Sequence, residues 1–374
     1  MKKENLRKII ELRHELHKYP ELSLEEKETK QRLIQFIRDN SSLRIVDRGD
    51  WFYVCNKEED EEGGIAFRAD MDALPILEEL DLPYASVHAG VSHKCGHDGH
   101  MAALCGLALE IDAAEKKEEQ RPIYLIFQPA EEIGKGGEKC AMLLKEKGIK
   151  EIYAYHNLGG FPEKSLVYRR GLTQPASEGL TIYLEGKPSH ASAPENGKNP
   201  SLAIAELIKL AAKLEEKLAS DSMSLCTIVN VRVGSKDFGV NAGEGEISFT
   251  IRAEEEANLH KMEEMLLKKA TELAEKGGLK IHHEIQDYFP ETKNHDRALD
   301  QAIQAAKRLG KECIEMPELW RASEDFGYYT KQCEGAILYI GSGEDHAPLH
   351  TPEYNFNDNI LETAVDLFLE LAMS

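Results

Sequence analysis

The sequence predicts an α/β fold, with a mostly parallel sheet that carries helices on both faces and a smaller domain inserted into it. Between residues 64 and 156, short apolar runs alternate with helical segments, as is typical of parallel strands joined by helices. From residue 176 the order becomes strand, helix, strand, strand, helix, strand, which indicates a ferredoxin-like module. The first rhythm resumes after Pro290. We therefore expect a discontinuous domain, residues 1–175 and 289–374, and an inserted domain, residues 176–288.

The elements follow from local patterns. Apolar residues from Leu6 to Leu16 share one helical face, and Pro20 closes that helix. Ser23 and Glu26 have the spacing of a capping box, which would open a second helix. Apolar runs predict buried strands at 64–70, 123–127, 152–155 and 336–341. In the inserted domain, strands are predicted at 180–185, 226–233, 246–252 and 279–285, and helices at 202–218 and 259–276.

Composition and charge argue against several classes of partner. The net charge of −21 disfavours both nucleic acid and anionic membrane surfaces. No apolar run approaches the ~20 residues of a membrane span, and the first residues lack the apolar core of a signal peptide. The seven cysteines are scattered and odd in number, so we expect reduced thiols in a cytoplasmic protein. The acidic run 58–62 is expected to be a solvated hairpin tip.

The segment from His93 to His100 concentrates reactive side chains. Cys95 and His97 can turn toward one point from an irregular loop, and thiolate with imidazole suits Zn²⁺, while imidazole also suits Mn, Fe, Co and Ni. Two alternatives stay open, a His-rich surface turn and a nucleophilic cysteine with a histidine base. The nucleophile is disfavoured because thiol and imidazole partners usually come from distant segments.

Four predicted strands are followed by side chains that bind metals well. In open α/β sheets, ligands bind beyond the carboxyl ends of the strands. The side chains at these ends are Asp70 and Asp72, Glu131 and Glu132, His156, and His350. Each alone has an ordinary structural explanation, such as a helix cap or a solvated turn. Their convergence at one sheet edge, in the same layer as Cys95 and His97, favours a metal site.

Six segments add a second line of argument. They are Leu16-His17 with Pro20-Glu21-Leu22, and residues 68–75, 95–100, 127–132, 186–191 and 323–326. Together they resemble the M20 metallopeptidase/amidohydrolase family, most closely its aminoacylase-like branch of N-acyl-amino-acid amidohydrolases, hippurate hydrolases and N-acetyldiaminopimelate deacetylases. Cys-Gly-His-Asp at 95–98 together with Gln-Pro-Ala-Glu-Glu at 128–132 is highly specific. The resemblance implies a catalytic domain that binds two metals and an inserted lid that also forms a homodimer.

The resemblance also implies roles for the matching positions. The ligands of two divalent ions, Mn²⁺ or Zn²⁺ with Co²⁺ or Ni²⁺ as alternatives, would be Cys95, His97, Glu132, His156 and His350. Cys95 stands where other branches use Asp and would bridge the ions. Glu131 would be the general base. Asp72 would assist catalysis by orienting the site, with Asp70 and Asp98 behind the ligands.

The inserted domain would supply His190, which polarises the substrate carbonyl from the partner subunit. Asn241 matches the Asn of the family's Asn-x-Ile-Pro segment, but the Pro is lost at Glu244. Asn241 and Arg252 are candidates to bind a substrate carboxylate, although Arg252 is equally explained as a solvated or ion-paired strand residue.

The implied activity is hydrolysis of the amide bond of small N-acyl-L-amino acids, by a metal-activated water with Glu131 as base. An exopeptidase or dipeptidase of the same fold would use the same chemistry and stays open as an alternative. A non-catalytic metal-binding protein is a further alternative, which is disfavoured because neither Glu131 nor any ligand is lost.

Overall fold

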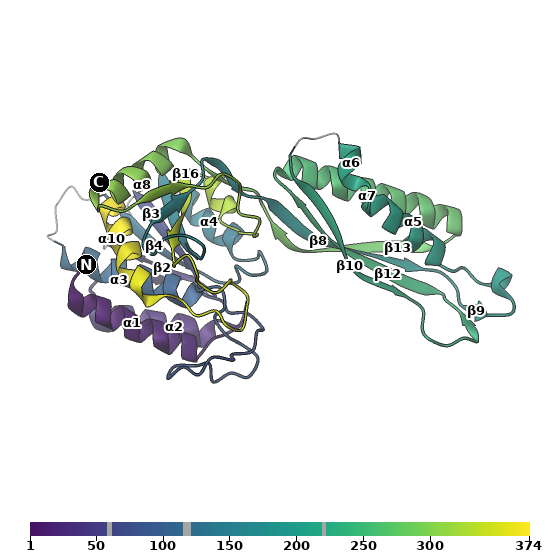
Figure 1. Ribbon diagram of the computed structural model, residues 1–374, viewed down its shortest axis with the longest axis horizontal. Helices are drawn as coiled ribbons and strands as arrows, with labels where there is room; N and C mark the ends of the chain where they lie inside the picture. The colour runs from purple at the N-terminus through teal and green to yellow at the C-terminus, as the bar shows by residue number, and fades with distance from the viewer. Residues whose placement is uncertain (58–61, 115–120, 219–221) are drawn as a thin grey trace. The chain divides into compact units, whose positions relative to one another are not determined.

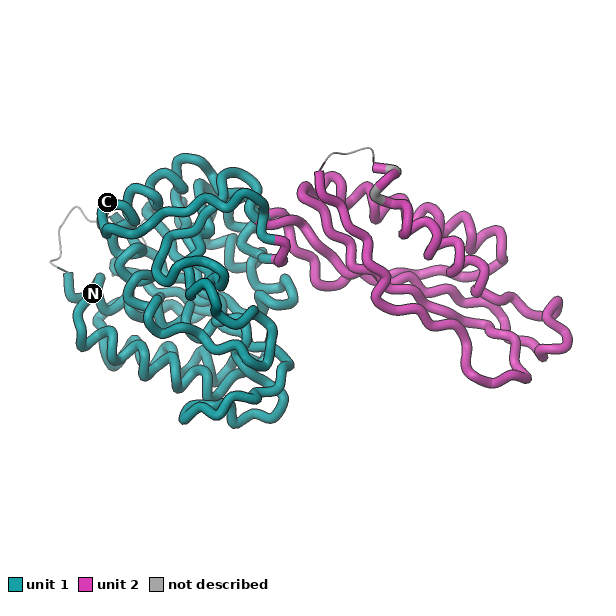
Figure 2. Tube along the Cα trace, viewed as in Figure 1, with its two compact units in different colours: residues 1–173, 292–320, 324–374 teal, residues 174–291, 321–323 magenta. Residues whose placement is uncertain are grey.

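The computed structural model describes residues 1–57, 62–114, 121–218 and 222–374. Residues 58–61, most of the run expected to form a hairpin tip, lie outside the described residues. The described chain divides into two compact units (Figure 2), the larger with residues 1–173, 292–320 and 324–374, and the smaller with residues 174–291 and 321–323. Among the described residues, none of the helices combines the length and the apolar character that crossing a membrane requires.

The larger unit holds, within its described residues, an eight-stranded sheet with a parallel centre (Figure 1). Across the sheet the strands are β1 (Arg44–Asp47), β2 (Phe52–Cys55), β4 (Ile123–Gln128), β3 (Ile65–Asp70), β5 (Glu151–Leu158), β16 (Glu334–Gly341), β6 (Leu166–Tyr168) and β15 (Cys313–Glu315). Strands β4, β3, β5 and β16 are mutually parallel. Strands β1 and β2 pair antiparallel with their neighbours, and β6 is antiparallel to β16 but parallel to β15. The predicted α/β fold with a mostly parallel sheet is confirmed.

Helices cover both faces of this sheet because its central strands are apolar on both sides. Along β3, Ile65, Phe67 and Ala69 belong to one apolar core and Ala66 to the other. The first core is closed by α1 (Lys3–Lys18), α2 (Lys27–Asn40), α3 (His97–Ala113), α8 (Asp296–Arg308) and α10 (Leu361–Ala372). The second is closed by α4 (Gly137–Glu146) and α9 (Gly327–Thr330). Because both faces of the sheet are covered by apolar cores, polar side chains are expected at the ends of the strands.

The start of α2 differs from the sequence prediction. The helix begins at Lys27, and the expected capping box of Ser23 and Glu26 is wrong, because neither side chain caps the helix. Leu24 has a left-handed backbone with φ of 70°, so the helix cannot begin directly after Ser23. The carboxylate of Glu21 instead accepts hydrogen bonds from the first turn, at 3.2 Å from the N–H of Glu28 and 2.7 Å from that of Thr29.

The smaller unit contains, in its described residues, a four-stranded antiparallel sheet in the order β10 (Ser224–Val233), β12 (Glu244–Ala253), β8 (Ala176–Glu185) and β13 (Lys280–Phe289). Helices α5 (Ser201–Ala211), α6 (Leu214–Leu218) and α7 (Glu256–Gly277) pack on one face of it (Figure 1). The chain order β8-α5-β10-β12-α7-β13 confirms the ferredoxin-like module. A turn at residues 212–213 divides the helix expected over 202–218.

The remaining elements of the described chain are short. Strand β7 (Gly171–Gln174) pairs with β14 (Thr292–Asn294), and β9 (Ser189–His190) pairs with β11 (Val240–Asn241). Two 3₁₀ turns span Pro194–Asn196 and Asp358–Ile360.

Candidate metal centre

A glycine at the start of α3 brings Cys95 and His97 side by side. Gly96 has a left-handed φ of 102°, and a Cβ atom there would lie 2.3 Å from Oδ1 of Asn157 and 2.5 Å from the hydroxyl of Tyr354. Only glycine fits both the backbone conformation and the space. The tight entry into the helix therefore holds Cys95 and His97 toward the carboxyl ends of the strands.

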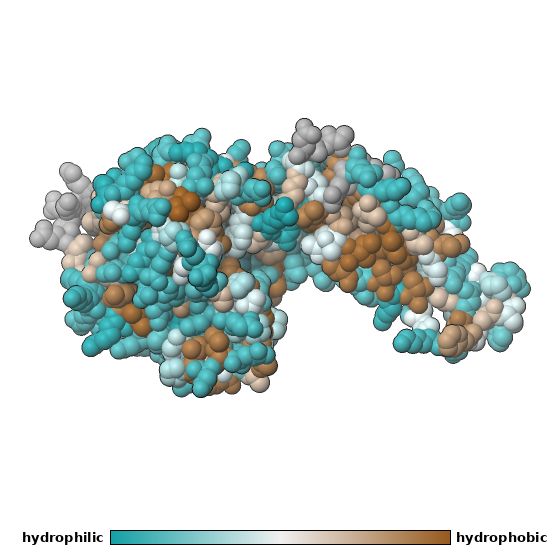
Figure 3. Space-filling view, in the orientation of Figure 1, coloured by the Kyte–Doolittle hydropathy of each residue, from teal (hydrophilic) through white to brown (hydrophobic). Residues whose placement is uncertain are grey.

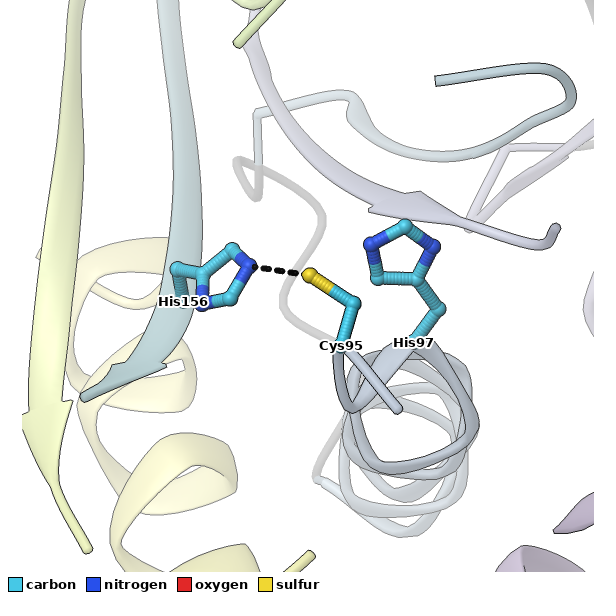
Figure 4. A group of neighbouring side chains, drawn as sticks. All are labelled: Cys95, His97 and His156. Atoms are coloured by element: carbon cyan, nitrogen blue, oxygen red, sulfur yellow. Dashed lines mark hydrogen bonds between the residues drawn. The ribbon is translucent and has the colours of Figure 1, made fainter. Parts of the chain in front are cut away.

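The structure brings all five predicted ligands together. Two groups of three ligand atoms, each within 4.8 Å of one another, share Cys95: one with His97 and His156, the other with Glu132 and His350. Sγ of Cys95 lies 3.3 Å from Nε2 of His156, and Figure 4 shows Cys95 between the rings of His97 and His156. The Glu132 carboxylate places one oxygen 3.6 Å from Nε2 of His97 and the other 3.6 Å from Nε2 of His350. Cys95 is thus the residue that the two groups have in common.

The donor set and its spacing fit divalent metal ions. Ligand atoms bound about 2.0–2.3 Å from one tetrahedral ion lie roughly 3.3–3.7 Å apart, which the distances from Cys95 and Glu132 match. Nε2 of His97 and Oε1 of Glu132 are buried and have no hydrogen-bond partner among the described residues. Burial and the nearby Glu132 carboxylate raise the pKa of the Cys95 thiol well above its ordinary range. A bound cation would satisfy these unpartnered atoms and would favour the deprotonated form of the Cys95 thiol.

Asp72 orients two of the predicted ligands. Nδ1 of His97 lies 2.9 Å from the carbonyl oxygen of Asp72, which leaves Nε2 to face the other ligands. The Asp72 carboxylate accepts hydrogen bonds from the Ser23 hydroxyl at 2.6 Å and from the Glu132 N–H at 2.9 Å. Burial alone would raise the pKa of the Asp72 carboxyl, but the His97 ring, with Nδ1 3.4 Å from Oδ1, lowers it below the ordinary value. Asp72 is therefore an anion that contacts two of the predicted ligands, His97 and Glu132.

Asp70 and Asp98 lie in different surroundings. The Asp70 carboxylate accepts hydrogen bonds from Nδ1 of His100 and from the Arg68 guanidinium, both at 2.7 Å. It therefore links the start of α3 to strand β3. Nε2 of His100 lies 2.8 Å from Oδ1 of Asn157, so both ring nitrogens of His100 are engaged. The Asp98 carboxylate turns toward α1 and pairs with His17 at 2.8 Å. Among the described residues it forms no hydrogen bond or ion pair with the five predicted ligands.

Glu131 is buried beside the predicted ligands, with Oε2 3.9 Å from Nε2 of His97. Its carboxylate also lies within 4.8 Å of those of Glu324 and Asp325. Burial, followed by the charges of Glu324 and Glu132, raises the pKa of Glu131 well above its ordinary range. A carboxylate with a raised proton affinity is suited to accept a proton from water.

The sequence did not predict the buried network of ion pairs and hydrogen bonds next to Glu131. The buried guanidinium of Arg68 donates to Asp325 at 2.7 Å and lies 3.1 Å from Oε1 of Glu324, while Gln128 also donates to Asp325. These contacts balance charges that would be costly to bury alone. The available signal was a single Arg within the apolar strand run 64–70, since a charge there requires a partner.

The remaining candidates lie in the smaller unit. His190 is on β9 and Asn241 on the paired strand β11. The Asn241 side chain donates to the Ser189 hydroxyl at 3.0 Å and accepts from the Asn199 amide at 2.7 Å, so it supports the turn that carries His190. Arg252 donates to the carbonyl oxygen of Arg321, and among the described residues no carboxylate pairs with it. Burial lowers the pKa of Arg252.

Comparison with known proteins extends these findings. Residues 66–374 match the model of peptidase family M20/M25/M40. The chain is 30% identical over 371 residues to a hippurate hydrolase from Campylobacter jejuni, covering 97% of this chain and 95% of that protein. It is 28% identical over 370 residues to an N-acetylcysteine deacetylase from Bacillus subtilis, covering 98% and 96%. A solved dinuclear metal-binding M20 peptidase from Bacillus subtilis superposes with a TM-score of 0.81 at 26% identity, covering 100% of this chain and 98% of that one.

Proposed function

Since the chain belongs to peptidase family M20/M25/M40, we propose that it hydrolyses small N-acyl-L-amino acids to a carboxylic acid and a free amino acid. Metal-dependent hydrolysis of amide bonds is the chemistry that the family and its solved dinuclear member support. The observation that carries the proposal is the shared position of Cys95 between two groups of ligand atoms. The names of the two relatives, a hippurate hydrolase and an N-acetylcysteine deacetylase, support a small acyl amino acid as substrate.

In this mechanism two divalent ions would be held by Cys95, His97, Glu132, His156 and His350. When bound, the ions would supply Lewis acidity, which would polarise the amide carbonyl and lower the pKa of water. Glu131 takes a proton from the attacking water and delivers it to the nitrogen of the leaving amino acid. Its burial beside Glu324 and its raised pKa support both steps. Asp72 keeps His97 and Glu132 in place through the contacts described above.

His190 is proposed to donate a hydrogen bond to the substrate carbonyl from the partner subunit. The N–H of Ser192 donates to Nδ1 of His190 at 3.1 Å, so the neutral ring carries its proton on Nε2. Among the described residues none bonds to Nε2, which supports its use as a donor. Developing charge on the carbonyl oxygen strengthens such a bond in the transition state.

A cytoplasmic homodimer formed through the smaller unit completes the proposal. Strands β10 and β13 lie at the edges of the four-stranded sheet, and open edges favour pairing. Figure 3 shows apolar side chains gathered on the visible face of this unit. Its exposed large apolar side chains include Leu202, Val229, Val231, Phe238, Val240 and Ile285. The seven cysteines form no disulfide bond with one another, which is consistent with a reducing compartment.

A substrate panel tests the proposed function. N-acetyl and N-benzoyl amino acids and the matching dipeptides are incubated with protein loaded with Mn²⁺, Zn²⁺, Co²⁺ or Ni²⁺, and products are separated by chromatography. We expect kcat/KM for the acyl amino acids to exceed that for dipeptides at least about tenfold, because a dipeptide brings an ammonium group that the acyl substrate lacks. Preference for dipeptides would assign an exopeptidase instead. Absence of hydrolysis by metal-loaded protein would assign a metal-binding protein without activity.

A further inference from the structure

The turn between β4 and the predicted base has an unusual backbone. Ala130, directly before Glu131, is fully buried and has a left-handed φ of 53°. A non-glycine residue in this region carries strain of about 1 kcal/mol or more, and persists where its surroundings hold it. The conformation of Ala130 sets the direction in which the next two side chains, Glu131 and Glu132, leave the main chain.

The N–H of Ala130 is held by a residue far away in the sequence. Oε1 of Glu26 accepts this hydrogen bond at 2.7 Å. Glu26 is itself buried, with 5% of its surface exposed, so water is a poor substitute acceptor. A buried N–H without an acceptor costs about 1–3 kcal/mol, which makes Glu26 the contact that the strained turn depends on.

The same segment also holds the other end of the turn. Ser23 donates to Asp72, and Asp72 accepts from the N–H of Glu132. Ser23 and Glu26 therefore act on residues 130 and 132, on either side of Glu131. The first turn of α2 is capped by the carboxylate of Glu21, and the side chain of Glu26 makes no capping hydrogen bond.

We propose that Glu26 is a positioning residue for amide hydrolysis, whose carboxyl group fixes the Ala130 turn and thereby aims Glu131 at the reacting water. The inference rests on the proposed function, because the turn matters for hydrolysis only if Glu131 is the general base. It makes no use of the charge of Glu26, since a neutral carbonyl oxygen accepts the same hydrogen bond. Burial and the charge of Asp72 raise the pKa of Glu26 to about 7, so a neutral group of the same shape is compatible with the site.

Three substitutions separate positioning from general stability. Glu26→Gln keeps the acceptor, Glu26→Ala removes it, and Glu26→Asp keeps the carboxyl group but withdraws the acceptor by one methylene. Glu25→Ala changes the exposed neighbouring residue and serves as the control. Each metal-loaded protein is measured for kcat, KM, metal content and deuterium exchange of the backbone amides of residues 130–133. Glu26→Asp stands in if Glu26→Ala does not fold.

We expect Glu26→Ala and Glu26→Asp to lower kcat roughly 10- to 100-fold, since a misplacement of about 1 Å costs up to ~10²-fold. KM and metal content should stay within about twofold, while the Ala130 amide exchanges faster than in the parent protein. Glu26→Gln and Glu25→Ala should match the parent in every measurement. Unchanged kcat in the Asp variant, or an equal loss in the Gln variant, overturns the inference. If the parent protein hydrolyses no amide, the proposed function is refuted instead. Deuterium exchange of the Ala130 N–H would then still show whether Glu26 holds it by a hydrogen bond.

Discussion

Nζ of Lys94 lies 2.6 Å from Oε1 of Glu78 in the interior of the protein, directly beside Cys95. The same ammonium group donates to the carbonyl oxygen of Tyr354 at 2.8 Å, and the Lys94 carbonyl accepts from the N–H of His350 at 2.8 Å. Lys94 thus joins the loops that carry Cys95 and His350. Since His350 has a left-handed φ of 59°, this contact also holds a strained residue in place.

The first prediction concerns the pH dependence of this ion pair. Burial alone would raise the pKa of Glu78, but hydrogen bonds from His17 and Lys94 lower it to about 2. A carboxyl with a lowered pKa in the folded state stabilises the protein above its unfolded pKa, near 4.5, and loses that contribution as the pH falls toward 2. The difference in unfolding free energy between parent and Glu78→Gln should therefore shrink between about pH 4.5 and pH 2.

Urea titrations of metal-free protein measure this difference without interference from metal release at low pH. Glu79→Gln changes an exposed neighbour and should differ little from the parent at any pH. A difference for Glu78→Gln that is independent of pH would show that the carboxylate is not held as an ion.

The second prediction concerns metal content. Because Cys95 belongs to both groups of ligand atoms, Cys95→Ala should leave less than about one ion per chain after metal loading and desalting, against about two for the parent. Cys95→Asp should retain close to the parental content, since a carboxylate also bridges two ions. Elemental analysis provides the count. Cys105→Ala, which removes another buried thiol on α3, is the control and should keep its metals.

The third prediction separates the base from the ligands. Glu131→Gln keeps the volume and polarity of the side chain but cannot take a proton, so kcat should fall about 10²–10⁴-fold while metal content is unchanged. Glu138→Gln, an exposed position on α4, should leave kcat unaltered. Steady-state kinetics with elemental analysis of the same samples give the result. A near-normal kcat in Glu131→Gln would remove this residue from the mechanism.

The fourth prediction tests the role of His190 across a dimer. Glu131→Gln and His190→Ala should each be inactive alone. Mixed at equal amounts and allowed to exchange, they should recover up to about one quarter of parental activity per chain, because half of the dimers are mixed and each has one complete site. Mixing Glu131→Gln with itself is the control. Verified exchange without recovery would place His190 in the same subunit or outside the reaction.

The fold was predictable because burial leaves a periodic trace in the sequence. The apolar run ending at Asp70 could form only a strand with two covered faces, and the structure gives Phe67 and Ala66 to opposite cores. The centre was predictable for a related reason. Parallel strands end at one edge of the sheet, so Glu132 and His156 were expected at the same edge, and in the structure each of them lies near Cys95.

Contacts that depend on tertiary approach left no such trace. Arg68 and Asp325 are 257 positions apart, and the spacing of Ser23 and Glu26 indicated a cap that the backbone of Leu24 prevents. The burial of Lys94 was likewise invisible, since lysine in a loop is usually solvated. Polar networks follow from the assembled fold, so sequence pattern alone locates the ligands but not the groups that orient them.

The fifth prediction concerns the substrate carboxylate. A product amino acid carries an α-carboxylate, and a chain with a net charge of −21 needs a local cation to bind it. Arg252 fits this role because it lies near the end of β12, is partly buried, and has no carboxylate partner among the described residues. The alternative of an ion-paired strand residue is thereby weakened.

Arg252→Ala should raise KM for N-acetyl amino acids by tens-fold, because a charge-assisted hydrogen bond contributes about 1.5–3 kcal/mol. It should change KM for the corresponding amino-acid amides far less, since these lack the charge that the guanidinium binds. Arg232→Ala removes an arginine that pairs with Glu246 at 3.5 Å on the same sheet, and it should affect neither substrate. Steady-state kinetics on both substrate series give the comparison. An equal rise in KM for acids and amides would mean that Arg252 acts through the structure of its unit and does not bind the carboxylate.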